Sequence, residues 1–194
     1  ESAYLLGGTG WYRKNFTLDK AMEGKEVRLD FDGVYMNATV YVNGHEVGTH
    51  PYGYTPFSFD ITDYVKVGEV NTIAVKVDHK TPSSRWYSGS GIYRSVYLTT
   101  TDKVHVDLNG VKVETPDLAK GNQNTNIKTT VLNESDAEKA VTVTHTMFEK
   151  GKDTKVGEVT TESKTVAAGQ SVDVEATMNV KDAKMWSPES PNLY

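Results

Sequence analysis

The chain has no cysteine among its 194 residues, and this absence excludes several kinds of site at once. Disulfide bridges, thiolate metal ligands and cysteine nucleophiles all need that residue. No apolar run in the sequence is long enough to span a bilayer. A net charge of −5 provides no basic surface for nucleic acid or for anionic membranes. We therefore expect neither nucleic acid nor a membrane among the partners.

Recognisable cofactor and metal motifs are also missing. The run Gly7-Gly8-Thr9-Gly10 precedes an expected strand and lacks the Lys-Ser/Thr ending of a phosphate loop. His45 and His50 flank a turn and are the pair to consider for a metal, but two histidines beside a hairpin are typical of an ordinary surface. Asp30 and Asp32 share one strand face, which favours solvated surface or turn support over an acid/base pair. The sequence thus predicts no cofactor, no metal site and no catalytic residue.

What the sequence does contain is strand-forming alternation, broken by turn residues every ten positions or so. The expected strands cover 11–18, 26–31, 38–42, 45–47, 55–61, 71–77, 93–99, 104–114, 126–133, 140–149, 155–165 and 171–180. Asn43-Gly44 joins two of them and predicts a tight hairpin, because both residues tolerate positive φ. A turn is expected over 65–69. The pattern is that of an all-β protein.

The composition of the chain changes at Lys103: aromatic residues and glycine are frequent before it, and Val, Thr, Lys and Glu after it. We place a domain boundary at about residue 102. Short strands with long loops favour a jelly-roll β-sandwich over residues 1–101. Medium strands favour an immunoglobulin-like β-sandwich without a disulfide over residues 102–194.

Aromatic residues are the strongest functional signal in the first half. Phe57 and Phe59 are two positions apart in a strand, so we expect both to point into the sandwich core. Tyr52 and Tyr54 fit a core position and an exposed sugar platform about equally well. Trp86-Tyr87 lie among serine and glycine, and a loop of that composition contributes little to a core, so we expect these rings to stack on a sugar.

Four stretches together resemble the beginning of family 2 glycoside hydrolases, especially bacterial β-galactosidases. They are GGTGWYRKNF at 7–16, FDGVYMNATVYVNGHEVGTHPYGYTPFSFDIT at 31–62, RWYSGSGIYR at 85–94 and WSPESPNLY at 186–194. Their order and spacing agree with the family over the whole chain. The resemblance implies a jelly-roll sugar-binding domain and an immunoglobulin-like domain, followed by a C-terminal catalytic TIM barrel of the same polypeptide.

The resemblance also implies a retaining mechanism with two glutamates, both of which belong to the barrel. No residue of this chain takes either role, and the fragment alone is expected to be inactive. The expected partners are a carbohydrate, a terminal β-galactoside, and the barrel that these domains brace.

The resemblance implies that the loop before the 85–94 motif reaches the substrate site. Relatives supply an aspartate there, whereas this chain reads Ser83-Ser84-Arg85-Trp86 without an acid. We expect Arg85 to donate hydrogen bonds to sugar hydroxyls and Trp86 to stack, with Tyr87, Tyr52 and Tyr54 as further substrate contacts. Arg94 is expected to tie down the loop or a domain interface, and Gly89 and Gly91 to allow a close backbone path.

Alternatives remain open on the sequence. The chain is also compatible with an autonomous carbohydrate-binding module or an adhesive β-sandwich array. The parent enzyme is also compatible with a β-glucuronidase or a β-mannosidase. The chain begins at Glu1 and we read it as a fragment of a bacterial protein, with an extracellular or cell-surface location favoured over the cytoplasm.

Overall fold

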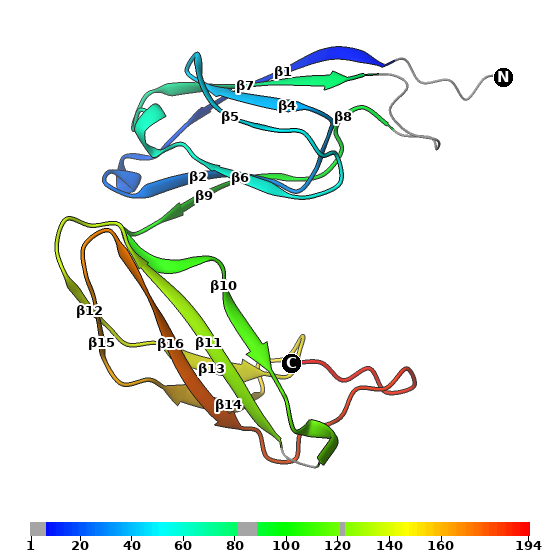
Figure 1. Ribbon diagram of the computed structural model, residues 1–194, viewed down its shortest axis with the longest axis vertical. Helices are drawn as coiled ribbons and strands as arrows, with labels where there is room; N and C mark the ends of the chain where they lie inside the picture. Colours follow the sequence, from blue (N-terminus) through cyan, green and yellow to red (C-terminus); the bar gives the residue numbers. More distant parts are fainter. Residues whose placement is uncertain (1–6, 81–88, 121–122) are drawn as a thin grey trace. The chain divides into compact units, whose positions relative to one another are not determined.

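The computed structural model describes residues 7–80, 89–120 and 123–194 (Figure 1). Strands dominate these residues, and the helical turns among them are short: Lys20–Met22, Thr62–Tyr64 and Leu118–Lys120. Within the described ranges, no helix has both the length and the apolar character needed to cross a membrane. The chain divides into two compact units, Glu1–Asp102 and Lys103–Tyr194. The prediction of an all-β protein is confirmed.

The first unit is a sandwich of two main antiparallel sheets. Its strands are β1 (Gly8–Thr17), β2 (Glu26–Phe31), β3 (Val34–Tyr35), β4 (Ala38–Val42), β5 (His45–His50), β6 (Phe57–Asp60), β7 (Val70–His79), β8 (Gly91–Ile92) and β9 (Val96–Thr101). One sheet has the order β1-β7-β4-β5 and the other β6-β2-β9, while β3 and β8 form a small pair. Figure 1 shows the two sheets facing each other, with β8 at one end of the unit.

Alternation of apolar side chains explains the core of this sandwich. Every second residue of β2 and of β4 is buried, as expected for strands with one face toward a partner sheet. The buried residues include Leu29 and Phe31 from one sheet and Val40 from the other. Phe57 and Phe59 pack against this core, and Phe57 stacks on Phe31 with ring centroids 4.8 Å apart. The prediction for these two phenylalanines is confirmed.

The hairpin between β4 and β5 forms where the sequence predicts it. Asn43 and Gly44 have φ angles of 50° and 86°, the positive values that a tight two-residue turn requires. The Asn43 side chain also donates to the Tyr64 carbonyl at 2.8 Å and accepts from the Thr72 amide at 2.9 Å. The turn residue therefore fixes two neighbouring segments as well as the hairpin.

The second unit, Lys103–Tyr194, is also built from antiparallel strands. Its strands are β10 (Val104–Glu114), β11 (Asn124–Asn133), β12 (Lys139–Val141), β13 (Thr144–Phe148), β14 (Lys155–Thr160), β15 (Lys164–Val166) and β16 (Gln170–Asn179). One sheet has the order β10-β11-β16, and the pairs β13-β14 and β12-β15 complete the described strands. One buried cluster is Ile127, Met178 and Val180, with Met147, Val156 and Val159 packed against it, and Val166 and Val174 of the same unit are also buried.

Two segments of this unit that were predicted as single strands are each divided in two. β12 and β13 take the place of the strand expected over 140–149, and β14 and β15 take the place of the one expected over 155–165. At the break, the Thr161 hydroxyl accepts a hydrogen bond from the Val143 amide at 3.1 Å in place of a regular ladder bond. A side chain that takes over a backbone bond in this way ends the ladder, and the alternation pattern does not reveal it.

Candidate functional site

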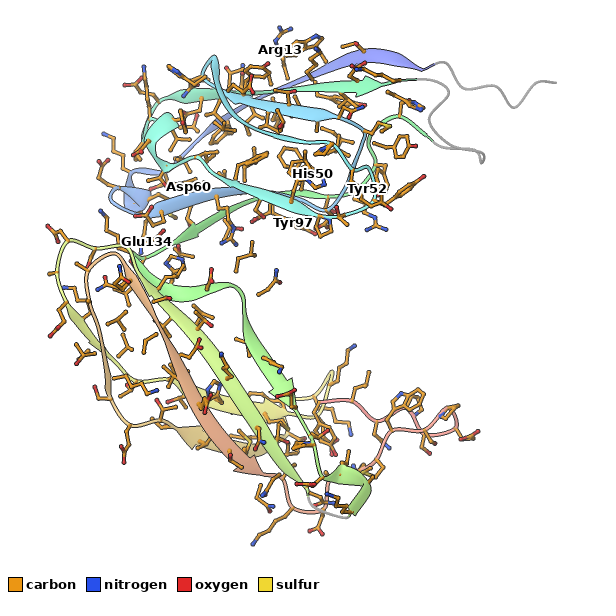
Figure 2. All side chains as sticks on the ribbon, viewed as in Figure 1. Arg13, His50, Tyr52, Asp60, Tyr97 and Glu134 are labelled. Carbon is orange, nitrogen blue, oxygen red and sulfur yellow. The ribbon has the colours of Figure 1, made fainter. Side chains whose placement is uncertain are left out.

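The candidate site is a group of aromatic side chains at one end of the first unit. We call Tyr35, Tyr52, Tyr54 and Tyr93 the tyrosine cluster. The ring centroids of Tyr35 and Tyr54 are 5.1 Å apart, and those of Tyr52 and Tyr54 are 5.7 Å apart in an edge-to-face arrangement. Tyr35 is buried, whereas Tyr52 and Tyr54 are 56% and 51% exposed. Figure 2 shows Tyr52 at the end of the unit where β8 lies.

Two glycines make room for the cluster. A Cβ atom added at Gly33 would lie 2.7 Å from the phenol carbon and hydroxyl of Tyr93, and one added at Gly53 would overlap the ring of Tyr35. The Tyr93 hydroxyl donates to the Gly53 carbonyl at 2.9 Å. The Arg94 guanidinium lies 5.3 Å from the centre of the Tyr93 ring, within cation–π range. The backbone at Gly33 and Gly53 therefore contacts the rings of Tyr93 and Tyr35 directly and holds them in place.

The flanks of residues 81–88 meet beside the cluster. His79 Nδ1 and the Ser90 hydroxyl form a hydrogen bond, and the His79 ring packs edge-on against Tyr35 with centroids 5.1 Å apart. Gly91 pairs with Tyr35 through the β3–β8 ladder. Asn37 donates from its side chain to the Asp78 carbonyl at 2.9 Å. The residues on both sides of 81–88 are thus fixed to the same end of the sandwich.

The electrostatics of the cluster favour neutral hydrogen-bond donors. Desolvation raises the pKa of Tyr54 above its ordinary value, and interactions with the Tyr35 hydroxyl raise it further. A phenol of this kind stays protonated at neutral pH and can donate or accept a hydrogen bond. Exposed rings with neutral hydroxyls can bind an uncharged ligand that has both an apolar face and polar edges.

The structure places only some of the predicted site residues. Arg85, Trp86 and Tyr87 lie outside the described residues. Tyr52 and Tyr54 are brought together with exposed rings. Sequence reasoning did not predict that Tyr35, His79 and Tyr93 lie beside them, because these three residues are far apart in the sequence. Tyr93 belongs to the 85–94 motif, which is the one signal that could have pointed to it.

The other polar groups considered from the sequence have structural explanations. His50 stacks on Phe57 with ring centroids 4.4 Å apart and forms a 3.0 Å hydrogen bond with the Thr55 hydroxyl. It lies at the opposite end of β5 from His45. No group of three or more histidine, aspartate and glutamate side chains that could hold a metal ion occurs in the described part of the chain.

Asp30 is the centre of a hydrogen-bond network on the sheet β6-β2-β9. It accepts hydrogen bonds from Arg28 at 2.7 Å, from Ser58 at 2.5 Å and from Thr99 at 2.5 Å. Burial would raise the pKa of Asp30, but these hydrogen bonds outweigh it and hold the pKa below its ordinary value. The carboxylate ties all three strands together, and its oxygens are already engaged. It is a structural group.

The fold places the chain in a class of all-β proteins that join consecutive sandwiches, here with an aromatic surface at the end of the first. Comparison with known proteins makes the assignment specific. Residues 4–102 match the sugar binding domain of glycosyl hydrolases family 2, and residues 104–194 match a second domain model of glycosyl hydrolases family 2. The chain belongs to this family, as its four motifs indicated.

Individual relatives agree with the assignment. The chain is 44% identical over 191 residues to the beta-galactosidase BoGH2A of Bacteroides ovatus, a match that covers 98% of this chain and 22% of that protein. It is 31% identical over 208 residues to a beta-glucuronidase of Formosa agariphila, covering 96% of this chain and 21% of that protein. The chain therefore spans about a fifth of the length of these relatives.

A solved structure agrees over the same length. The crystal structure of a glycosyl hydrolase family 2 member from Bacteroides cellulosilyticus matches with a TM-score of 0.90 and 35% sequence identity. The match covers 98% of this chain and 26% of that chain. The prediction of two successive β-sandwiches of this family is confirmed.

Proposed function

We propose that this chain is a non-catalytic N-terminal part of a retaining glycoside hydrolase that cleaves terminal β-galactosides. It braces a C-terminal catalytic barrel of the same polypeptide and lends a loop to the rim of the substrate site. The observation that carries the substrate assignment is the 44% identity, over almost the whole chain, to a protein named beta-galactosidase. The tyrosine cluster supports a role next to a sugar.

In this proposal Arg85, Trp86 and Tyr87 are the loop residues that contact substrate. The described residues on either side of 81–88 support it, because the His79–Ser90 hydrogen bond brings both flanks to the tyrosine cluster. Trp86 stacks on the apolar face of the pyranose, and Arg85 donates to neighbouring hydroxyls. Tyr52 and Tyr54 extend the aromatic surface toward further sugar units.

The bracing role is supported by apolar surface on the first unit. Three successive residues of β9 are substantially exposed, namely Val96, Tyr97 and Leu98. They border an apolar groove of about 440 Å³ whose other side includes Tyr12 of β1. Exposed apolar patches of this kind are typical of interaction surfaces, and a neighbouring domain is the occupant that the bracing role requires. We propose that residues 1–101 and 102–194 act as two separate supports.

The test is made on the full-length protein with nitrophenyl β-galactoside as substrate. We expect Trp86→Ala to lower kcat/KM roughly tenfold, the equivalent of about 1.4 kcal/mol of transition-state stabilisation. The matched control is Tyr64→Ala, which removes an exposed ring that contacts His45 instead of the cluster. An unchanged kcat/KM in Trp86→Ala would show that the loop does not contact the substrate.

A second candidate function is β-glucuronidase activity, because a relative of similar coverage is named beta-glucuronidase. Both nitrophenyl glycosides are assayed with the same full-length enzyme. A kcat/KM for the glucuronide above that for the galactoside would replace the proposed substrate.

Measurements on the isolated 194-residue chain distinguish both of these functions from that of an autonomous carbohydrate-binding module. We expect no turnover and no calorimetric signal with lactose at millimolar concentration. Binding that is lost on Tyr54→Ala would establish a binding module in place of an accessory domain.

A further inference from the structure

A β-bulge in the second unit contains an asparagine followed by a glycine. The pairing of β10 with β11 is interrupted at residues 107–110, which form the bulge. Asn109 has a φ of 56°, a left-handed conformation that asparagine tolerates better than most residues. A Cβ atom added at Gly110 would lie 2.8 Å from the carbonyl oxygen of Asp107, which leaves no room for a side chain. The local geometry therefore favours asparagine at one position and requires glycine at the next.

An Asn-Gly pair is chemically reactive because the backbone nitrogen of the glycine can attack the side-chain amide of the asparagine. Glycine has no side chain to shield that nitrogen, and its backbone adopts many conformations. The sequence contains this pair twice, at Asn43-Gly44 and at Asn109-Gly110. The two asparagines have φ angles of 50° and 56°, so their backbones are closely similar. Any difference in reactivity therefore depends on how each side chain is held.

The side chain of Asn43 is held by three hydrogen bonds. Its nitrogen donates to the Tyr64 carbonyl at 2.8 Å and to the Asn71 side-chain oxygen at 2.8 Å. Its oxygen accepts from the Thr72 amide at 2.9 Å. Turning the side-chain amide toward the nitrogen of Gly44 would break these bonds, and their loss adds to the barrier of the attack.

The side chain of Asn109 is held by none of these devices. It is exposed, and it forms no hydrogen bond with another residue in the described part of the chain. Its amide can therefore rotate toward the Gly110 nitrogen without breaking a contact within the protein. The same dipeptide thus occurs once with a fixed side chain and once with an unrestrained one.

We propose that Asn109 is a site of spontaneous deamidation and that the fold protects Asn43 from the same reaction. The deprotonated Gly110 nitrogen forms a bond to Cγ of Asn109, and the bond from Cγ to Nδ2 breaks, so that Nδ2 leaves as ammonia and a five-membered succinimide remains. Water then adds to either ring carbonyl and opens the ring. The net reaction consumes one water, releases one ammonia and involves no oxidant or reductant.

The two products affect the bulge differently. Attack of water at Cγ opens the ring to aspartate, which adds one negative charge to a chain whose net charge is −5. Attack at the backbone carbonyl opens it to isoaspartate, in which the main chain runs through Cβ and is one carbon longer. Both products place a carboxylate on the surface of the second unit. The inference does not depend on the proposed substrate.

The test follows both asparagines in the same sample of full-length protein during incubation in a mildly alkaline buffer, which favours the deprotonated glycine nitrogen. Peptide mapping by mass spectrometry detects deamidation as a mass gain of about 1 Da, and an isoaspartate-specific methyltransferase detects the longer main chain. We expect Asn109 to react at least about tenfold faster than Asn43, the equivalent of about 1.4 kcal/mol in the barrier. Equal rates in the folded protein would overturn the proposal.

Unfolded peptides that carry the two sequences separate the effect of the fold from that of the neighbouring residues. We expect both peptides to deamidate at similar rates. A difference between the peptides as large as that in the folded protein would assign the selectivity to sequence and contradict the protective role of the Asn43 hydrogen bonds. An Asn109 that reacts in the peptide but stays intact in the folded protein would also reject the site.

Asn109→Gly is the matched blocking variant, because glycine accepts the positive φ and has no side-chain amide. In this variant the mass gain in the peptide that contains position 109 should disappear, while the rate at Asn43 stays unchanged. A mass gain that persists in that peptide would place the modification at another residue and overturn the assignment.

Discussion

At the scale of single residues, Glu149 shows how one carboxylate secures the C-terminal segment of the second unit. It accepts hydrogen bonds from Lys152 at 2.5 Å and from Lys184 at 2.8 Å. These two hydrogen bonds lower the pKa of Glu149 from 4.5 to about 2, and the bond from Lys152 makes the larger contribution. Lys184 belongs to the segment that leads to Tyr194, whose hydroxyl accepts from the Lys184 amide at 2.6 Å. The ion pair with Lys184 therefore joins the end of β13 to the segment that leads to the last residues of the chain.

The lowered pKa sets a pH window. Because the folded pKa lies below the unfolded one, the carboxylate stabilises the fold above about pH 4.5, and that contribution is lost as the pH falls through about 2. We expect Glu149→Gln to lower the urea midpoint of the second unit at pH 7 and to have little effect near pH 2. Glu189→Gln is the control. Equal destabilisation at both pH values would show that the charge is not responsible.

At the scale of elements, the short strand β8 depends on a residue without a side chain. Gly91 has a φ of 101°, and a Cβ atom added there would overlap the Tyr12 hydroxyl. Gly89 lies two residues earlier, and a Cβ atom there would meet no atom within 4 Å. The sequence motif makes both glycines look equally necessary, whereas the geometry requires only one of them.

This contrast gives a matched pair of variants. We expect Gly91→Ala to destabilise the first unit by about 1–3 kcal/mol, because it combines a disfavoured φ with a clash against Tyr12. Gly89→Ala is expected to change the free energy of unfolding by less than about 0.5 kcal/mol. Urea denaturation followed by tyrosine and tryptophan fluorescence measures both. Similar free energies for the two variants would contradict the geometry around Gly91.

The elements also show how far sequence reasoning reaches. Alternation and the Asn43-Gly44 turn predicted the longer strands of the first unit, because each signal is local and one face of each strand is buried. They did not predict the two-residue strands β3 and β8, and the strand expected over 93–99 begins only at Val96. Alternation did not predict the break between β12 and β13, where Thr161 replaces a ladder bond. The sequence identified Tyr52 and Tyr54 as candidates, but not Tyr35, whose place beneath Tyr54 depends on contacts between distant segments.

At the scale of the whole molecule, each of the two units uses a buried asparagine side chain to fix a turn. Asn71 is fully buried in the first unit, accepts from the Lys66 amide at 2.7 Å and donates to the Lys66 carbonyl at 2.8 Å. It fixes the turn expected over 65–69. Asn133 is fully buried in the second unit and donates to the Ala137 and Val166 carbonyls at 2.8 and 2.9 Å. Each unit thus has its own core and its own buried amide.

Because the two cores are separate, we expect two unfolding transitions in calorimetry. Asn71→Ala leaves backbone groups of the first unit without hydrogen-bond partners. It should lower the free energy of unfolding of that unit by about 2–4 kcal/mol and shift only that unit's transition to lower temperature. Asn133→Ala should have a similar effect on the second unit only. Asn126→Ala, at an exposed position of β11, is the control and should change little. One transition that shifts equally in both variants would mean that the units fold as a single cooperative body, because each variant removes contacts from only one core.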